Sequence, residues 1–261
     1  MRIVRFTPGP EAGLGQDPLF GVLEDDATIS IISGDPIYSG IQKTAAKIEL
    51  NKVRLLAPII PRSKVVCVGK NYADHAAEMG GVVPEEPIIF LKPNTSVIGP
   101  NDTIVWPDMS ERIDHEAELA IVIGRICKDV PLERVNDVIF GYTIANDVTA
   151  RDIQKKDGQW TRAKGFDTFC PIGPWVDTDF IPGTQKITAT IAGEVKQSAQ
   201  ISDMIFDVPT IVNFVSRVMT LLPGDIILTG TPAGIGPMVA GEKATMAIEG
   251  LGELTNKVSA K

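Results

Sequence analysis

The stretch DHEAELAIVI, residues 114–123, places two acidic side chains at the start of an apolar strand. Because successive side chains of a strand point to opposite faces, Glu116 and Glu118 share one face, which continues as Ala120 and Val122. An isolated Glu-x-Glu pair of this kind is more often a solvated strand edge than a functional site. A further acidic group at the same place would change that interpretation.

A second apolar strand, expected at Val138–Ala145, supplies that group because it ends directly in Asn146-Asp147. Two carboxylates about 4 Å apart repel each other by roughly 4 kcal/mol at an effective dielectric constant near 20, so three that converge need a cation or protons. Oxygen ligands favour hard cations, and the chain has only 2 histidines, which disfavours zinc. Glu116, Glu118 and Asp147 therefore predict a Mg²⁺ or Mn²⁺ site.

The composition excludes several classes of protein. The 261 residues are 44% hydrophobic and 22% charged, so the chain can bury a sizeable core. Its formal charge of -8 disfavours nucleic acid and anionic membranes as partners. It shows no apolar run of the roughly 18 residues that a membrane span needs, and no apolar signal segment near its start. The spacing of Cys67, Cys127 and Cys170 indicates packing rather than disulfides or a metal site, so we expect a soluble, cytoplasmic protein.

Strand patterns dominate the chain and predict an α+β, β-rich fold. Residues 1–60 are expected to form a small β-rich domain, and prolines at positions 58 and 61 precede a larger domain at 61–261. The clearest helix is expected at Val208–Leu222. The expected strands are Arg2–Phe6, Leu19–Glu24, Ala27–Ser33, Lys64–Val68, Ile88–Leu91, Thr103–Trp106, Glu116–Ile123, Val138–Ala145, Lys186–Ala192, Asp225–Thr229, Lys243–Ile248 and Leu254–Val258.

A short helix is expected directly after Asp147. Thr149-Ala150-Arg151-Asp152 has the form of a capping box with Thr149 as the N-cap, which places Arg151 and Gln154 on one face. An arginine there would bind a substrate carboxylate. The alternative is a surface ion pair between Arg151 and an acidic residue of its own helix.

Another short helix is expected within residues 70–81, where glycines at 80 and 81 close it. It places His75 and Glu78 on one face, and a glutamate in that position would orient a general base. The alternative is a solvated histidine. The two glycines favour hinge motion of this segment.

Six segments in this order resemble the fumarylacetoacetate hydrolase family: NYADHAAEMG, PIIFLKPNTSVIGP, DHEAELAIVIG, NDVTARDIQ, WTRAKGFDTFCPIGPWV and GDIILTGTPAGIGP. The resemblance covers about residues 60–258. It implies a β-rich roll with a mixed β-sandwich that is usually dimeric, so we expect a homodimer. Residues 1–60 would either cover the site or extend the dimer contact.

The resemblance also implies a role for each residue of the site. Glu116, Glu118 and Asp147 would be metal ligands, with Mg²⁺ the usual ion. The remaining implied residues are the dyad His75 and Glu78 on a mobile lid, Lys164 facing the metal-bound substrate, Arg151 and Gln154 lining the pocket, and Thr231 in the loop that holds the substrate carboxylate. His115 matches no ligand position and is assigned no catalytic role.

The implied activity is the hydrolysis of a carbon-carbon bond of acylpyruvates, a class of 2-oxo acids, through a metal-stabilised pyruvate enolate. Oxaloacetate decarboxylation stays open as an alternative. So does an isomerase or decarboxylase of the 2-hydroxyhepta-2,4-diene-1,7-dioate type, as used in aromatic catabolism. The last alternative is a catalytically silent relative that binds a metal.

Overall fold

The structure is a computed structural model that describes residues 1–25 and 27–260. The described residues form a large sheet of 12 strands. These are β1 (Arg2–Pro8), β2 (Leu19–Leu23), β3 (Thr28–Ile32), β4 (Lys43–Glu49), β5 (Val53–Leu55), β6 (Val65–Gly69), β7 (Ile88–Lys92), β8 (Val97–Ile98), β11 (Ala117–Ile123), β12 (Ile139–Asn146), β14 (Cys170–Asp177) and β17 (Ile226–Leu228). Their order is β4-β3-β2-β1-β14-β12-β11-β17-β6-β7, and β5 and β8 pair with β1 and β14.

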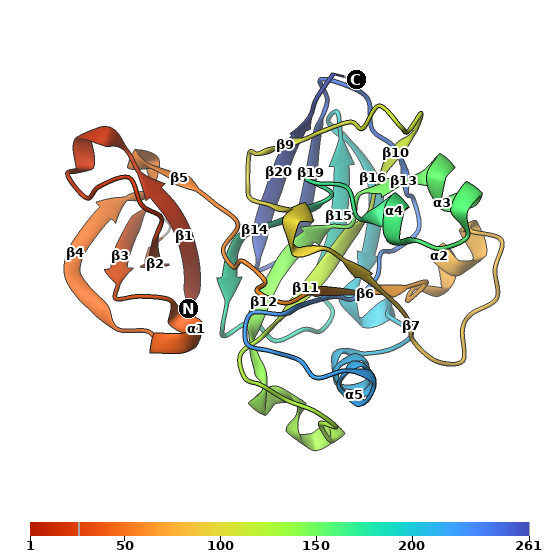
Figure 1. Cartoon of the computed structure of the whole chain (residues 1–261), viewed down its shortest axis with the longest axis horizontal. Helices are drawn as coiled ribbons and strands as arrows, with labels where there is room; N and C mark the ends of the chain where they lie inside the picture. Colours follow the sequence, from red (N-terminus) through yellow and green to blue (C-terminus); the bar gives the residue numbers. More distant parts are fainter. Residues whose placement is uncertain (26, 261) are drawn as a thin grey trace.

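A second sheet packs against the large one, where β15 and β19 contact β11 (Figure 1). Its strands, given in spatial order, are β16 (Glu194–Gln200), β15 (Lys186–Ile191), β19 (Lys243–Ile248), β20 (Gly252–Val258) and β9 (Thr103–Ile104). A small sheet joins β13 (Thr149–Ala150), β10 (Ile113–His115) and β18 (Gly236–Pro237). The expected α+β, β-rich fold is therefore confirmed.

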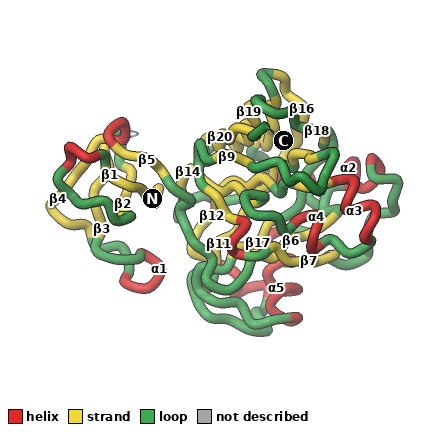
Figure 2. The backbone as a smooth tube through the Cα atoms, turned by 45° about the horizontal axis from the view of Figure 1, so that its top comes forward, coloured by secondary structure: helices red, strands yellow, loops and turns green. Residues whose placement is uncertain are grey.

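The helices are short and lie outside the sheets (Figure 2). They are α1 (Pro36–Ser39), α2 (Ala73–Glu78), α3 (Arg151–Asp157), α4 (Thr161–Lys164) and α5 (Val208–Val218), with 3₁₀ turns at Pro10–Ala12, Leu50–Lys52, Asn94–Ser96, Leu132–Asp137 and Ile201–Asp203. None of the helices in the described part of the chain has the length and apolar character that crossing a membrane requires.

Strand β11 is buried on both faces, which explains its unbroken run of β-branched and aliphatic residues. Leu119, Ile121 and Ile123 pack into the core between the two sheets. Ala120 and Val122 point to the other face and join separate apolar clusters. The start of β11 is therefore held in the interior, together with any charge that it carries.

The N-terminal strands continue the large sheet, because β1 pairs antiparallel with β14 through Arg2 opposite Asp177 and Ile3 opposite Val176. Ile3 packs in one cluster with Val122 and Val176. Figures 1 and 2 both place β1–β5 on the opposite side of the molecule from helices α2–α4. Within one chain this segment does not cover that side. The division at residue 60 stays a prediction.

Several sequence-based expectations about secondary structure are wrong. The helix at Val208–Leu222 ends at Val218, because Leu221 leaves it to form a backbone bridge with Cys127. The strand at Thr103–Trp106 ends at Ile104. Strands β4, β5, β14 and β16 were not expected. β14 escapes detection because prolines 171 and 174 interrupt it, and proline is typical of strand edges and turns.

We expect the cluster around Ile3 to hold the N-terminal strands to the rest of the sheet. Ile3→Ala removes buried methyl groups, and such substitutions cost about 2–5 kcal/mol of unfolding free energy. Urea denaturation measures this loss. Val195→Ala, at a position 62% exposed on β16, is the control and should change stability by less than about 0.5 kcal/mol. Equal effects of the two substitutions would contradict the packing role of Ile3.

Candidate active site

The ends of two strands bring the acidic residues together. β11 and β12 pair with Ala117 opposite Asn146. Because Glu116 precedes β11 and Asp147 follows β12, their side chains meet beyond this pair, and Asp147 N–H donates to Glu116 O at 2.9 Å. Glu118 reaches the same point from within β11. Carboxylate oxygens of Glu116, Glu118 and Asp147 all lie within 4.8 Å of one another, so the predicted convergence is observed.

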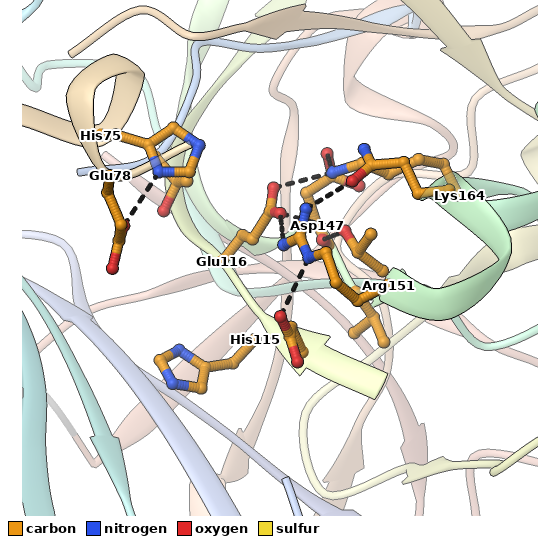
Figure 3. Close-up of polar contacts among 12 residues, drawn as sticks. His75, Glu78, His115, Glu116, Asp147, Arg151 and Lys164 are labelled. Atoms are coloured by element: carbon orange, nitrogen blue, oxygen red, sulfur yellow. Dashed lines mark hydrogen bonds and ion pairs between the residues drawn. The ribbon is translucent and has the colours of Figure 1, made fainter. Parts of the chain in front are cut away.

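Three basic side chains neutralise most of this acidic cluster (Figure 3). Lys164, on α4, places Nζ 2.7 Å from Glu116 Oε2 and 2.6 Å from Asp147 Oδ2. Lys92, at the end of β7, lies 2.5 Å from the other oxygen of Asp147, and Arg151 donates to Glu116. Burial alone would raise the pKa of Glu116, but Lys164 and Arg151 hold it below its ordinary value.

Glu118 lacks such a partner, since no basic side chain of the described residues forms an ion pair with it. Its Oε2 accepts a hydrogen bond from Gly230 N–H at 2.6 Å. Burial and the neighbouring carboxylates of Asp147 and Glu116 raise the pKa of Glu118 well above its ordinary value. A divalent cation fits this arrangement, because three hard oxygen donors converge and one of them, Glu118, forms no ion pair with a basic side chain of the described residues.

The predicted capping box at Thr149 is wrong. Thr149 and Ala150 form β13 and pair with β10, and Ala150 is the N-cap of α3 without a side-chain hydrogen bond. The Thr149 hydroxyl lies 3.1 Å from Glu116 Oε1 and 3.0 Å from the backbone oxygen of Asp147. The residue expected to start a helix instead positions a carboxylate of the cluster.

Arg151 points into the cluster rather than to the surface. Its Nε donates to Asp114 Oδ2 at 2.9 Å, and its Nη1 donates to Gln154 Oε1 at 2.6 Å. The shared face of Arg151 and Gln154 is therefore confirmed. The alternative, pairing with acidic residues of its own helix, is wrong, since Asp157 binds Arg162 instead.

Helix α2 holds His75 and Glu78 on one face beside the cluster (Figure 3). His75 Nδ1 lies 3.3 Å from Glu78 Oε2, and His75 is buried, so the alternative of a solvated histidine is wrong. The Glu78 carboxylate also accepts from Gly234 N–H at 3.2 Å. Asn71 fixes the start of the helix by donating from its buried amide to Thr229 O at 2.7 Å.

The described residues enclose one small pocket beside the acidic cluster. Every predicted site residue lines it except Glu78, which contacts His75 instead. Its cavity volume is about 30 Å³, which is enough for ordered water. The placement of the predicted residues is thus observed, while their catalytic and ligand roles stay predictions.

His115 lies outside the pocket, but it supports a residue that lines it. Its Nδ1 donates to Gln197 Oε1 at 3.1 Å, and Gln197 Nε2 donates to Thr231 Oγ1 at 2.8 Å. Ala117 N–H also donates to Gln197 Oε1, which orients the amide. Burial lowers the pKa of His115, although the hydrogen bond to Gln197 opposes that shift. That His115 has no catalytic role stays a prediction.

Sequence reasoning missed Lys92, Asp114 and Gln197. Lys92 ends the apolar run IIFLK, and a lysine that closes a buried strand is a signal that could have been used. Asp114 lies two residues before Glu116, but an aspartate at the start of a strand is also typical of a turn. Gln197 lies in a polar segment, and nothing there distinguishes it from its exposed neighbours.

Two family models match this chain. The family model described as "Fumarylacetoacetate (FAA) hydrolase C-terminal" matches residues 64–259, which include the whole acidic cluster. The chain belongs to the fumarylacetoacetate hydrolase family. A second family model, "Rv2993c-like, N-terminal", matches residues 1–58. Members of the hydrolase family are metal-dependent hydrolases, isomerases or decarboxylases, and this chain is an enzyme of that family.

Two relatives show how far the similarity extends. Protein Rv2993c of Mycobacterium tuberculosis is 60% identical over 231 residues, covering 87% of this chain and 85% of the relative. The mitochondrial oxaloacetate tautomerase FAHD1 of Arabidopsis thaliana is 46% identical over 198 residues, covering 74% of this chain and 89% of the relative.

Solved structures of the family share the fold. The 5-carboxymethyl-2-hydroxymuconate delta-isomerase of Mycobacterium smegmatis is 48% identical, with a TM-score of 0.91 and 100% of both chains covered. The fumarylpyruvate hydrolase of Pseudomonas aeruginosa, solved with Mn²⁺ and pyruvate, is 34% identical. Its TM-score is 0.73, over 80% of this chain and 92% of that one.

We expect Glu118→Gln to separate the charge of the cluster from its packing. In EDTA the variant should melt at least as high as the wild type, because the amide keeps the shape of the side chain and removes a carboxyl group whose ionised form is disfavoured by burial and by its acidic neighbours. Mg²⁺ or Mn²⁺ at about 100 times its Kd should stabilise the wild type by about 2.7 kcal/mol and the variant far less. Thermal melts measure both effects, with exposed Glu253→Gln as the control. Equal stabilisation of all three proteins would contradict a metal site at Glu118.

The buried imidazole of His115 predicts a loss of stability in acid. Its pKa in the folded protein lies below its ordinary value of 6.5, so the unfolded chain binds the proton more readily as the pH falls through that value. His115→Asn should therefore reduce the drop in unfolding free energy between about pH 7.5 and about pH 5.5. Urea titrations at both pH values measure the difference. An equal fall in unfolding free energy in wild type and variant would show that protonation of His115 does not destabilise the folded protein.

Proposed function

We propose that this enzyme hydrolyses a carbon-carbon bond of acylpyruvates or related 2-oxo acids with the help of Mg²⁺ or Mn²⁺. The observation that carries the proposal is the incomplete neutralisation of the cluster, in which Glu118 lacks a cation while Glu116 and Asp147 have theirs. Glu116, Glu118 and Asp147 would hold the ion. When bound, it would act as a Lewis acid on the keto group of the substrate. The Mn²⁺ and pyruvate in the Pseudomonas hydrolase support this choice of ion and ligand.

The side chains around the cluster suit the substrate's charges. Arg151 is fixed by Asp114 and Gln154, so it presents a pre-oriented guanidinium at the pocket wall. The Thr231 hydroxyl is held from behind by Gln197 and would bind the carboxylate of the 2-oxo acid. Lys164 would face the negative charge that develops on the pyruvate part, because its ammonium lies between two carboxylates at the centre of the site.

His75 and Glu78 would activate the attacking water. Glu78 orients the imidazole through Nδ1, which leaves Nε2 to accept a proton from water. The hydroxide formed adds to the distal carbonyl, and the bond between that carbon and the pyruvate methylene breaks. Its electron pair stays on the pyruvate part, which then takes up a proton. The products are a carboxylic acid and pyruvate.

We expect helix α2 to move when the substrate binds. His75 of the helix and Met79 after it line the pocket beside the acidic cluster, so a 2-oxo acid at the cluster would contact this segment. The contact that would have to break is the one between Glu78 and Gly234, at 3.2 Å. Closure would then restore the dyad and exclude bulk water.

Oxaloacetate conversion is a second candidate function. The observation that favours it is the 46% identity to the Arabidopsis protein named oxaloacetate tautomerase. The same dyad would serve, since tautomerisation moves a proton between carbon and oxygen of the same 2-oxo acid and needs no water.

Turnover of acetylpyruvate and of oxaloacetate, each with Mg²⁺, Mn²⁺ or EDTA, tests the proposal. We expect metal-dependent release of pyruvate from acetylpyruvate, and His75→Asn should lower kcat about 10²- to 10⁴-fold because it removes the general base. Asp74→Asn, an exposed change on the same helix, is the matched control. Conversion of oxaloacetate alone would favour the second candidate, and turnover that is insensitive to EDTA would refute both.

A further inference from the structure

A second cavity lies where the N-terminal strands meet the rest of the molecule. Its volume is about 210 Å³, and it is lined by residues of the N-terminal segment, by the linker around residues 59–62 and by Gly224 before β17. It therefore forms where the two segments matched by the family models adjoin. None of the described residues that line it also lines the pocket beside the acidic cluster, so the two cavities are separate.

Strand β1 leaves space for this cavity because it changes its pairing partner. It pairs with β14 through Arg2 and Ile3, and with β5 from Phe6 onward. Arg5 falls between these two pairings and lines the cavity. Since side chains alternate along a strand, Arg5 shares the face of Ile3, which packs in the apolar cluster that joins β1 to the large sheet. An arginine thus occupies the edge of an otherwise apolar face.

Arg5 is the basic residue of the cavity that has no partner of its own. Asp35 lines the same cavity, but its Oδ1 accepts from Ile37 N–H at 3.0 Å and its Oδ2 lies 3.5 Å from Arg62 Nη2. Among the described residues no carboxylate forms an ion pair with Arg5. Burial lowers the pKa of Arg5, although the nearby charge of Asp35 opposes that shift. The cavity therefore presents a partly buried guanidinium that the protein does not pair.

The walls around this guanidinium are largely apolar. Phe20, Ile37 and Ile59 line the cavity, and all three pack in the same cluster as Ile3. Phe20 also lies opposite Arg5 in the pairing of β1 with β2. A ligand in the cavity would therefore meet one positive charge and an apolar surface, which is the usual composition of a site for a small organic anion.

Contacts on the rim hold the cavity in shape. The Tyr38 hydroxyl of α1 donates to Pro223 O at 2.9 Å, in the turn before β17. The guanidinium of Arg62 lies over the Tyr38 ring, 4.1 Å from its centroid. Helix α1 is thereby joined both to the linker and to the turn before β17. Walls that are fixed before a ligand arrives reduce the entropy lost on binding.

The cavity and the acidic cluster lie at opposite ends of two strands. β6 begins three residues after Arg62, and β17 begins two residues after Gly224. The two strands run parallel and end beside the cluster, where Gly69 lines the pocket and Gly230 N–H donates to Glu118. The 5 residues of β6 span about 16 Å. A ligand in the cavity therefore does not compete with one at the cluster.

We propose that this cavity binds a small carboxylate with an apolar body, and that Arg5 is its ion-pair partner. A single guanidinium suits a carboxylate, because the two groups pair through parallel hydrogen bonds. A phosphate would bring more negative charge to a cavity that Asp35 also lines. Pockets for drug-sized ligands occupy about 300–1,000 Å³, so this smaller cavity selects a small molecule. The inference does not depend on the reaction at the acidic cluster.

Isothermal titration calorimetry with sodium benzoate as the probe tests the proposal, in EDTA so that no metal at the cluster attracts the carboxylate. Benzamide has the same ring without the charge, and it should bind the wild type about 10- to 100-fold more weakly. Arg5→Met should weaken benzoate by a similar factor and leave benzamide unchanged. Acetate, which lacks the ring, should bind more weakly than benzoate because it leaves the apolar walls uncovered.

A matched control separates the site from a general effect of charge. Arg217→Met removes an arginine from an exposed position on α5 and should bind benzoate as the wild type does. Thermal melts without ligand show whether each variant is folded. Crystals of the wild type with benzoate need no variant, and they should show the carboxylate within hydrogen-bond distance of the Arg5 guanidinium.

Several outcomes would overturn the proposal. The wild type could fail to bind benzoate, or could bind benzamide or inorganic phosphate as tightly. Equal affinity of wild type and Arg5→Met for benzoate would place the probe elsewhere, and density for benzoate at the acidic cluster alone would do the same.

Discussion

The structure depends on the burial of three converging carboxylates at the ends of two paired strands. The register that sets Ala117 opposite Asn146 makes Glu116 and Asp147 neighbours, and the core on both faces of β11 denies them bulk water. Buried charges of one sign are tolerated only when opposite charges accompany them. Lys92 of β7 and Lys164 of α4 lie far apart in the sequence, yet both form ion pairs with the cluster. Strand β7 and helix α4 therefore have to pack beside it.

This requirement organises the parts of the site by function. In the proposed function the cluster would hold one end of the substrate, and α2 places His75 and Glu78 beside the cluster. Buried side chains behind the pocket position some of those that line it. Asp114 holds Arg151 and Gln197 holds Thr231, so the geometry of these two pocket side chains is set by buried partners.

The sequence predicted the parts of the molecule that follow local periodicity. β11 and β12 were expected from apolar runs, and the convergence of Glu116, Glu118 and Asp147 followed from where those runs begin and end. What failed depended on tertiary contacts. β14 holds a central place in the sheet despite its prolines, because pairing with β12 on one side and β1 on the other outweighs local preference. Lys92 was missed and Thr149 was misjudged, because their partners lie in other elements.

The sheet order has a consequence for how the molecule is made. β17 lies between β11 and β6, and Thr229 at its end bonds to Leu119, a residue 110 positions earlier. While the chain is being synthesised, β6 and β11 each present an unpaired edge until residues 226–228 emerge. Contacts so remote in sequence slow folding and expose apolar edges to other chains. Because residues 226–228 lie near the end of the chain, assembly of the site is a late event in biosynthesis.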